Sequence, residues 1–151
     1  MISFSILVPT YKRNKFLERA LESICAQKAS ISEIIVIDDF GSEECELLVN
    51  KFNNTGFAKF IYKKNQSKRG EYFAKNWANQ FVTGNYIAFL DDDDFWSENY
   101  LENSNENIIK HNPDIILSDN KNYYDKNKLE DGKKIPDQFK IEDFLVGNPG
   151  A

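Results

Sequence analysis

Four consecutive aspartates, Asp91 to Asp94, follow the apolar run NYIAFL and precede two aromatic residues. At an effective dielectric constant of about 20, two charges about 4 Å apart repel each other by about 4 kcal/mol. A helix that follows accounts for only one or two of them, because its N-terminus favours negative charge. Hard divalent cations take oxygen ligands from one or two carboxylates together with phosphates. The run therefore predicts a site for Mn²⁺ or Mg²⁺. A calcium EF-hand loop is excluded, because Trp96 stands where that loop needs glycine.

Other polar groups follow two further apolar runs. Pro9-Thr10-Tyr11 ends the first run, and Asp38 and Asp39 end the second. A carboxylate there can accept hydrogen bonds from a base N–H or from ribose hydroxyls, while one of the pair is expected only to cap the next helix. Lys68 and Arg69 lie in a basic loop. Arg69 can meet a phosphate or a base edge, but a solvated loop is an equal alternative.

The elements that must position these residues follow from the periodicity of apolar side chains. Strands are expected at 2–8, 33–39, 57–62, 85–90 and 114–119, and helices at 14–27, 42–53, 71–84 and 97–111. Ser42 and Ser97 are the expected helix caps. The apolar faces of the first and last helices are expected to contain Phe16, Leu17, Ala20, Leu21, Ile24, Cys25, Tyr100, Leu101, Ile108 and Ile109.

Alternating strands and helices predict an α/β fold with a mostly parallel sheet flanked by helices. Ligands of such folds bind at the carboxyl ends of the strands, where the polar tips lie. Residues 1–119 form the predicted core. Residues 120–151 are more polar, with a loop or hairpin at 120–138 and a short helix at 141–146. We expect them to begin a further region of a larger protein.

Composition excludes several classes of protein. The chain has 151 residues and a net charge of −5, which argues against nucleic acid as the main partner. No apolar run approaches the roughly 20 residues of a membrane span, and no signal peptide is recognised. Cys25 and Cys45, without CxxC spacing, predict a reducing compartment and no disulfide. His111 is expected at a helix end, where a cation is favourable. We expect a cytoplasmic protein, with the inner face of the membrane as the alternative.

Three segments together carry a resemblance. They are SILVPTYKRNKFLERALESICAQ, EIIVIDDFGSEE and AKNWANQFVTGNYIAFLDDDDFW, in that order. They resemble the family-two glycosyltransferases of GT-A fold, in which strand-PTYN-R-helix, VDDGS, ARN and FLDxDD motifs follow one another. The match runs over about residues 3–119, and the order of the motifs is far more specific than any one of them. The resemblance implies a Rossmann-like GT-A sandwich that binds a nucleotide-diphosphate sugar.

The resemblance also implies roles for residues. Asp93 is the expected metal ligand, because it belongs to the DxD motif both as Asp91-x-Asp93 and as the pair Asp92-Asp93. Either Asp91 or Asp92 is expected to face the ribose or to order the loop, and Asp94 to start the next helix. The expected nucleotide-binding residues are Pro9, Thr10, Tyr11, Arg13, Asp38, Asp39, Arg69, Asp91 and Asp92.

The sequence departs from the family pattern at three places. Lys12 replaces the usual asparagine after PTY, and Lys75 replaces the arginine of ARN. Arg69 is a candidate to supply the missing guanidinium. Phe40 is inserted before the glycine of the second motif, so the local loop geometry is expected to differ.

The implied reaction is a metal-dependent, inverting transfer of a sugar, with a UDP-linked donor expected, to a saccharide or lipid-linked saccharide. Mn²⁺ or Mg²⁺ stabilises the leaving diphosphate, and a carboxylate base activates the acceptor hydroxyl. We expect that base beyond Ala151, since Asp119 is better read as a loop cap. The alternatives are a nucleotide-diphosphate-binding module without transferase activity and a sugar nucleotidyltransferase. The latter is disfavoured because its glycine-rich signature is missing. A phospho-receiver domain lacks support, because Pro9-Thr10-Tyr11 occupies the place of its acidic pair.

Overall fold

The computed structural model describes residues 2–39, 41–65, 71–124 and 128–132. The chain forms two compact units, Met1–His111 and Asn112–Ala151. The first unit contains all four predicted helices and the first four predicted strands, and the second contains a hairpin. The division between the two units follows His111.

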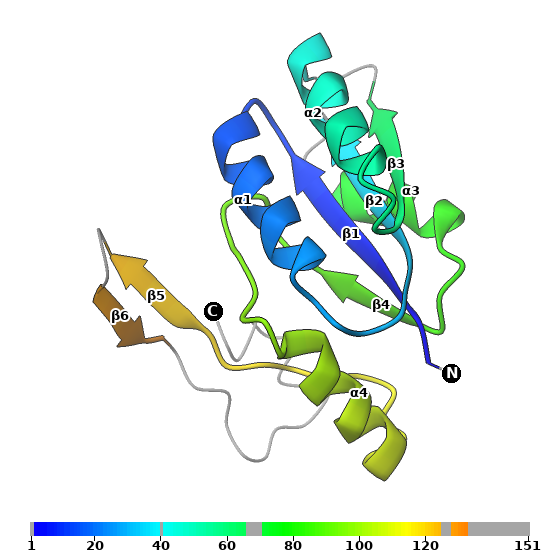
Figure 1. Ribbon diagram of the computed structural model, residues 1–151, viewed down its shortest axis with the longest axis vertical. Coiled ribbons are helices and arrows are strands. Elements are labelled where there is room, and N and C mark those ends of the chain that lie inside the picture. Colours follow the sequence, from blue (N-terminus) through cyan, green and yellow to red (C-terminus); the bar gives the residue numbers. More distant parts are fainter. Residues whose placement is uncertain (1, 40, 66–70, 125–127, 133–151) are drawn as a thin grey trace. The chain divides into compact units, whose positions relative to one another are not determined.

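A four-stranded parallel sheet organises the first unit, as Figure 1 shows. Its spatial order is β3-β2-β1-β4, and every neighbouring pair is parallel. The strands are β1 (Phe4–Thr10), β2 (Ile31–Asp38), β3 (Lys59–Lys64) and β4 (Tyr86–Phe89). Thr10 lies opposite Asp38, and Asp38 lies opposite Lys64, so the strand ends meet at one edge. The predicted mostly parallel α/β fold is confirmed.

Helices cover both faces of this sheet. The helices of this unit are α1 (Asn14–Cys25), α2 (Glu43–Asn53), α3 (Glu71–Ala78), the short 3₁₀ helix η1 (Asn79–Phe81) and α4 (Tyr100–His111). In Figure 1, α1 and α2 lie on one face of the sheet and α3 on the other. This arrangement follows from right-handed crossovers, because the chain moves outward from β1 to β3 and then returns to β4 on the far side of β1.

The core follows the two-residue alternation of the strands. Leu7, Ile35 and Ile37 pack with Ala74 and Ala78 of α3. The alternate residues Ile6, Val8, Ile34 and Val36 are also fully buried, and they point to the opposite face of the sheet. Strands buried on both faces explain why their sequences are continuous apolar runs.

The chain adds strands on one side of β1, as β2 and β3, and then adds β4 on its other side. The topological switch point of the fold therefore lies between β1 and β4. The chain leaves β1 toward α1 and leaves β4 through the four aspartates. A crevice at such a point, outside the carboxyl ends of the strands, is where α/β sheets bind ligands. Thr10 and the aspartate loop are therefore brought together by topology, although they lie 82 residues apart.

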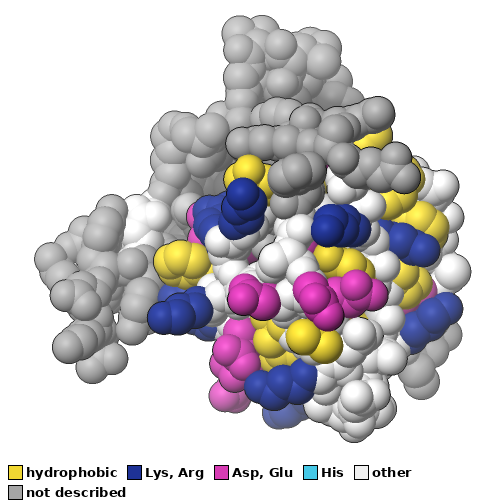
Figure 2. Space-filling model, turned by 90° about the horizontal axis from the view of Figure 1, so that it is seen from above, with side chains coloured by type: hydrophobic (Ala, Val, Ile, Leu, Met, Phe, Trp, Pro, Cys, Tyr) yellow, Lys and Arg dark blue, Asp and Glu magenta, His cyan; other side chains and the backbone are white. Residues whose placement is uncertain are grey.

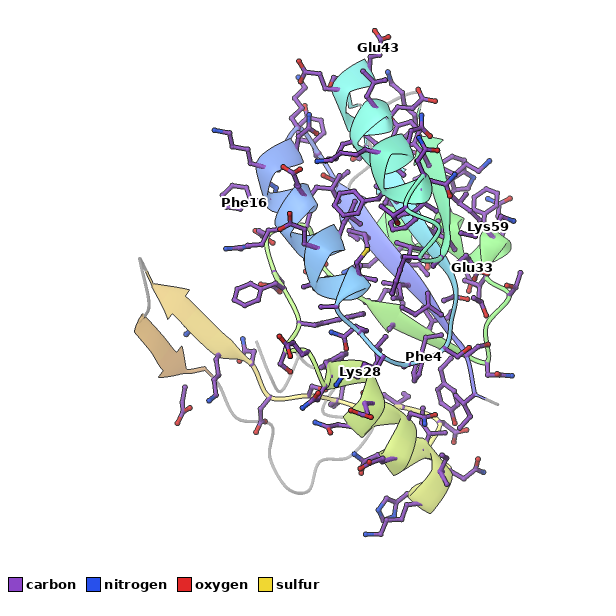
Figure 3. All side chains as sticks on the ribbon, in the orientation of Figure 1. Phe4, Phe16, Lys28, Glu33, Glu43 and Lys59 are labelled. Carbon is purple, nitrogen blue, oxygen red and sulfur yellow. The ribbon has the colours of Figure 1, made fainter. Side chains whose placement is uncertain are left out.

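The opposite end of the sheet is fixed by a buried carboxylate. Ser5 and Thr83 donate hydrogen bonds from their hydroxyls to Glu33, and the Thr83 N–H lies 3.0 Å from Glu33 Oε1. Burial raises the pKa of Glu33, but these hydrogen bonds outweigh it and hold the pKa below its usual range. In Figure 3, Glu33 lies near Phe4 and far from Glu43 at the start of α2, which separates this anchor from the strand tips.

Several expectations about the helices are corrected. The last helix begins at Tyr100 instead of Ser97, so Asp94 precedes it and does not start it. The third helix ends at Ala78 and continues only as η1, short of the predicted Gly84. Phe16 and Ile109 are exposed, although their spacing predicted inward faces. Phe16 instead packs beside the Arg19 guanidinium, 5.8 Å from its ring, because an exposed aromatic face attracts a cation.

The predicted fifth strand at 114–119 is wrong. The segment has no strand conformation, and Ile115 and Leu117 are exposed. An apolar run becomes a strand only when a neighbour satisfies its backbone, and none of the described strands pairs with it. Of the loop or hairpin expected at 120–138, the structure has a hairpin, as β5 (Lys121–Tyr124) and β6 (Lys128–Asp131) pair antiparallel. The expected helix at 141–146 lies outside the described residues.

The remaining expectations concern the thiols, the histidine and the membrane. Cys25 and Cys45 are both free thiols. His111 is the last residue of α4, at the helix end where it was expected. Among the described residues, no helix combines the length and the apolar character that crossing a membrane requires.

Candidate nucleotide-diphosphate site

Acidic and basic side chains gather at the carboxyl edge of the sheet. Figure 2 looks onto the side toward which the strand arrows of Figure 1 point, and there the two kinds of side chain lie next to one another. The tips of β1, β2 and β4 contribute Thr10, Asp38 and the aspartate loop. The sequence alone predicted this convergence, because the carboxyl ends of parallel strands share one edge.

Asp92 is the buried centre of the site. The Thr10 hydroxyl donates a hydrogen bond to Asp92 Oδ2 over 2.7 Å, and Arg13 Nη2 lies 2.7 Å from Asp92 Oδ1. Burial raises the pKa of Asp92, and the Thr10 hydrogen bond and the Arg13 charge oppose that shift. Arg13 precedes α1 directly, and its carbonyl accepts hydrogen bonds from Phe16 and Leu17, so the start of the helix fixes its backbone.

The neighbours of Asp92 are more accessible and are paired with different cations. The Asp91 side chain is 42% exposed and lies 2.9 Å from Lys75 Nζ. The Asp93 side chain is 48% exposed and lies 2.6 Å from Arg13 Nη1, whereas the Asp92 side chain is 1% exposed. Asp91, Asp92 and Asp93 therefore coexist because Lys75 and Arg13 offset their charges and because they differ in burial.

Asp38 is enclosed by its surroundings. Tyr62 donates a hydrogen bond to Asp38 Oδ2 over 2.9 Å, and the thiol of Cys45 donates another. Burial nevertheless raises the pKa of Asp38, and the buried carboxylate in turn helps to raise the pKa of Tyr62. A Cβ atom at Gly41 would lie 1.5 Å from Asp38 Oδ2, so glycine is needed for the loop to pass this side chain.

Asp39 faces a different set of partners. Asn65 donates a side-chain hydrogen bond to Asp39 Oδ1 over 2.9 Å, and the Asp39 N–H donates to the Thr10 carbonyl over 2.8 Å. The Asn65 N–H in turn donates to the Asp38 carbonyl over 2.9 Å. Loops that follow three strands are thereby joined, and the Asp39 carboxylate is oriented by an amide group.

The oxygen donors at this edge suit a hard divalent cation. Asp91 and Asp93 present accessible carboxylates, and Mg²⁺ commonly needs only one or two of these together with phosphate oxygens. Among the described residues, no three acidic, histidine or cysteine side chains already converge as a complete metal cage. The donor set fits a cation that arrives with a diphosphate better than a permanently bound structural ion.

The predicted site residues divide into three groups. Thr10, Arg13, Asp91, Asp92 and Asp93 are brought together, and Asp38 and Asp39 lie at the end of the adjacent strand. Pro9 is buried in β1, and Tyr11 follows that strand, with Lys12 Nζ 5.4 Å from its ring centroid. Lys68, Arg69 and the inserted Phe40 lie outside the described residues.

Three site residues were not predicted from the sequence. Tyr62, Asn65 and Lys75 each contact one of the predicted aspartates. Lys75 had a signal, because it replaces the arginine of the ARN motif. Tyr62 and Asn65 had none, since a strand tyrosine and a loop asparagine are ordinary in those places.

Comparison with known proteins agrees with this arrangement. Residues 5–148 match the family described as Glycosyl transferase family 2. The Escherichia coli enzyme UDP-Glc:alpha-D-GlcNAc-diphosphoundecaprenol beta-1,3-glucosyltransferase WfgD is 30% identical over 108 residues, which cover 72% of this chain and 42% of that protein. The poly(ribitol-phosphate) beta-N-acetylglucosaminyltransferase TarS of Staphylococcus aureus is 27% identical over 119 residues, which cover 78% of this chain and 21% of that protein.

Solved structures show the same fold. TarS in complex with UDP-GlcNAc matches with a TM-score of 0.67 and 23% identity, covering 74% of this chain and 32% of that one. The mannosyltransferase PcManGT from Pyrobaculum calidifontis, in complex with GDP-Man and Mn²⁺, matches with a TM-score of 0.64 and 22% identity, covering 70% of this chain and 32% of that one. Both have the GT-A fold, which confirms the expected architecture. The chain spans less than half the length of each of these relatives.

Proposed function

We propose that this chain, which belongs to glycosyltransferase family 2, binds a nucleotide-diphosphate sugar and acts as the donor-binding part of a glycosyltransferase. The donor is proposed to be UDP-linked, and the transfer to be metal-dependent and inverting at the anomeric carbon. The acceptor is proposed to be a saccharide or a lipid-linked saccharide. Because the chain spans less than half of its relatives, the proposal is tested first as binding.

One observation carries the proposal most directly. Thr10, Arg13 and the aspartate loop are joined through the buried Asp92 at the switch point of the sheet. This contact fixes the accessible carboxylates of Asp91 and Asp93 on either side of it. A diphosphate with its cation needs both kinds of side chain at a fixed place, because carboxylates bind the cation and basic side chains bind the diphosphate.

The base is assigned to the end of β2. Asp39, oriented by Asn65, is proposed to accept a hydrogen bond from a base N–H, with Tyr11 and the backbone of Pro9 and Thr10 against the base. Uracil, thymine and guanine all offer such an N–H, so this contact alone does not select the base. UDP is favoured because TarS was solved with UDP-GlcNAc and WfgD is named for UDP-Glc, whereas PcManGT holds GDP-Man.

The aspartates are assigned different roles. Asp93 is proposed to hold Mn²⁺ or Mg²⁺, and Asp91 to face the ribose or the same ion, since both are accessible. Asp92 is proposed to order the loop through Thr10 and Arg13. When bound, the cation supplies Lewis-acid stabilisation of the leaving diphosphate. Arg13 and Lys75 are placed to add positive charge beside that group.

The second candidate is a nucleotide-binding module that does not transfer sugar in this form. It is favoured by the same geometry, because all the contacts described here concern the donor side. Either reading requires nucleotide-diphosphate binding, and they separate only when transfer is assayed with an acceptor. A sugar nucleotidyltransferase is the least supported reading, since the relatives described above are named as transferases of the sugar itself.

Calorimetric titration of UDP, GDP and dTDP, each with and without Mn²⁺, tests the proposal. We expect UDP to bind most tightly, and Mn²⁺ to strengthen binding. Asp93→Asn is expected to weaken Mn²⁺-dependent UDP binding by about 10- to 100-fold, a typical loss when a contact that supports a metal site is removed. The neighbouring Asp94→Asn removes the same charge from the same loop and is the matched control, with an expected loss of only a few-fold through weaker attraction of the cation.

The proposal fails if none of the three nucleotides binds. The assignment of Asp93 fails if UDP binds equally well with and without Mn²⁺, or if the two asparagine variants behave alike.

A further inference from the structure

Three polar side chains form a row along α1 and the turn that follows it. Arg19, Ser23 and Gln27 are spaced by four residues, which places them above one another at steps of about 6 Å along the helix and its C-terminal extension. Their partners are not on the sheet. All three reach the chain that leads from the aspartate loop into α4, at residues 93–101.

Each hydrogen bond between this row and the segment is made to a backbone group of the segment. Arg19 Nη2 donates to the Asp93 carbonyl over 2.6 Å, and the Trp96 N–H donates to Ser23 Oγ over 3.1 Å. Gln27 Nε2 donates to the Ser97 carbonyl over 2.8 Å, and its Oε1 accepts from the Leu101 N–H over 3.0 Å. The partners follow the row in chain order, so the segment runs along the helix.

The upstream part of this segment is held from β1 and the start of α1, because Asp92 contacts Thr10 and Arg13, and Asp93 contacts Arg13. Residues 90–99, between β4 and α4, have no helix or strand, and the bonds from the Asp94 N–H to the Asp91 carbonyl and from the Tyr100 N–H to the Ser97 carbonyl each close one turn. The row adds contacts to the backbone from Asp93 onward. Arg19 is itself oriented, because its guanidinium carbon lies 4.8 Å from the Phe95 ring centroid and 5.8 Å from that of Phe16. A stacked guanidinium keeps its planar donors in one direction.

We propose that Arg19, Ser23 and Gln27 are positioning residues for the cation- and diphosphate-binding aspartates. They hold the backbone at Asp93 and after it, without donating a hydrogen bond to any of the carboxylates that we assign to the ligand. The row therefore acts through Asp93, and Arg19 is its functional end, because it contacts that residue directly. The inference rests on the proposed function, since it concerns the same site.

The sign of one effect separates positioning from simple electrostatics. Arg19 is a positive charge beside a proposed cation site, so its removal should strengthen cation binding if only Coulomb forces matter. A positioning role predicts the opposite result, because the loop that carries Asp93 loses its anchor. A purely structural role predicts lower stability with unchanged affinity in the remaining folded protein.

The test uses the 151-residue chain with Arg19→Met, Arg19→Lys and the control Lys15→Met, which removes a positive charge from an exposed position of α1. Mn²⁺-dependent UDP binding is measured by calorimetry, and the exchange of backbone amides in residues 93–101 by mass spectrometry. We expect Arg19→Met to weaken binding by about tenfold or more, as loss of supporting contacts does at metal sites. Amides of residues 94–97 should exchange faster. Arg19→Lys should recover part of the affinity, and Lys15→Met should match the wild type.

Binding by Arg19→Met that equals or exceeds that of the wild type overturns the positioning role. If the wild type binds no nucleotide with Mn²⁺, the proposed function fails and this inference fails with it. If the wild type binds UDP and Arg19→Met binds it equally well, only this inference fails. Should Arg19→Met not fold, Ser23→Ala takes its place, because it removes the acceptor of the Trp96 N–H; the other hydrogen bond of this hydroxyl, to the Ala20 carbonyl, lies within α1. Unchanged UDP affinity in a folded Ser23→Ala whose Trp96 amide exchanges faster also overturns the proposal.

Discussion

Replacing Thr10 by valine tests the centre of the site. Valine has nearly the shape of threonine and suits a strand, but it lacks the hydroxyl that donates to Asp92 Oδ2 over 2.7 Å. Asp92 is fully buried, so water cannot take the place of the lost donor. Serine at the same position keeps the hydroxyl and is the matched control.

The expected loss of stability follows from the charge of the acceptor. Hydrogen bonds to charged groups contribute about 1.5–3 kcal/mol, and leaving a buried acceptor unsatisfied costs a similar amount. We expect Thr10→Val to lower the free energy of unfolding by about 2 kcal/mol in total, because the buried methyl group of valine offsets a part of the lost hydrogen bond. For a domain of this length, that corresponds to a fall in Tm of about 4–8 °C.

The pH dependence of this loss has a definite sign. Burial raises the pKa of Asp92, and the Thr10 hydrogen bond opposes the rise, so Thr10→Val should raise the pKa further. The hydrogen bond stabilises the ionised carboxylate. The stability that this hydrogen bond contributes is therefore fully present at a pH above the Asp92 pKa of the variant. It is lost as the pH falls through the Asp92 pKa of the wild type. The difference in stability between the two proteins should shrink under acid conditions.

Urea unfolding followed by tryptophan fluorescence at several pH values between 4 and 8 measures this difference. The reasoning is refuted if Thr10→Val is as stable as the wild type at neutral pH, or if the difference does not change with pH. It is also refuted if Thr10→Ser loses as much stability as Thr10→Val, because the serine hydroxyl preserves the donor.

Two further substitutions probe the loops of the site. Lys12 has a φ of +54°, a left-handed conformation that is unfavourable for most side chains by about 1–2 kcal/mol, whereas asparagine adopts it more readily. Lys12→Asn should therefore raise the Tm in a calorimetric scan, and an unchanged or lower Tm would contradict the strain. Gly41→Ala brings a Cβ within 1.5 Å of Asp38 Oδ2 and should cost about 1–3 kcal/mol in urea unfolding. That cost should shrink when Asp38 is also replaced by alanine, and an equal cost in both backgrounds would locate the clash elsewhere.

Local patterns were sufficient to predict most of the first unit. The short apolar runs of β1 and β2 placed two central strands, because strands buried on both faces need such residues. The same reasoning failed at 114–119, where the apolar run has no strand partner among the described residues. A periodic sequence specifies which conformation a segment prefers, but pairing depends on a neighbour that lies elsewhere in the chain.

The site was predictable in position but not in its contacts. Parallel strands bring their carboxyl ends to one edge, so Thr10, Asp38 and the aspartates were expected there. The partners of Asp38 and Asp39, which are Tyr62 and Asn65, depend on how far each strand extends past its neighbour. Single-sequence patterns do not determine such offsets, since they arise from the packing of the whole sheet.

The two ends of the Arg13 guanidinium explain how a site rich in negative charge can exist before a cation arrives. Nη2 lies 2.7 Å from the buried Asp92, and Nη1 lies 2.6 Å from the half-exposed Asp93. An exposed ion pair contributes only about 0–1 kcal/mol, so a divalent cation would displace Arg13 from Asp93 at small cost. Breaking the buried half would cost several kcal/mol, because the Asp92 charge would remain uncompensated. In the proposed complex Arg13 would therefore stay attached to Asp92, and its freed donors would be available to the diphosphate.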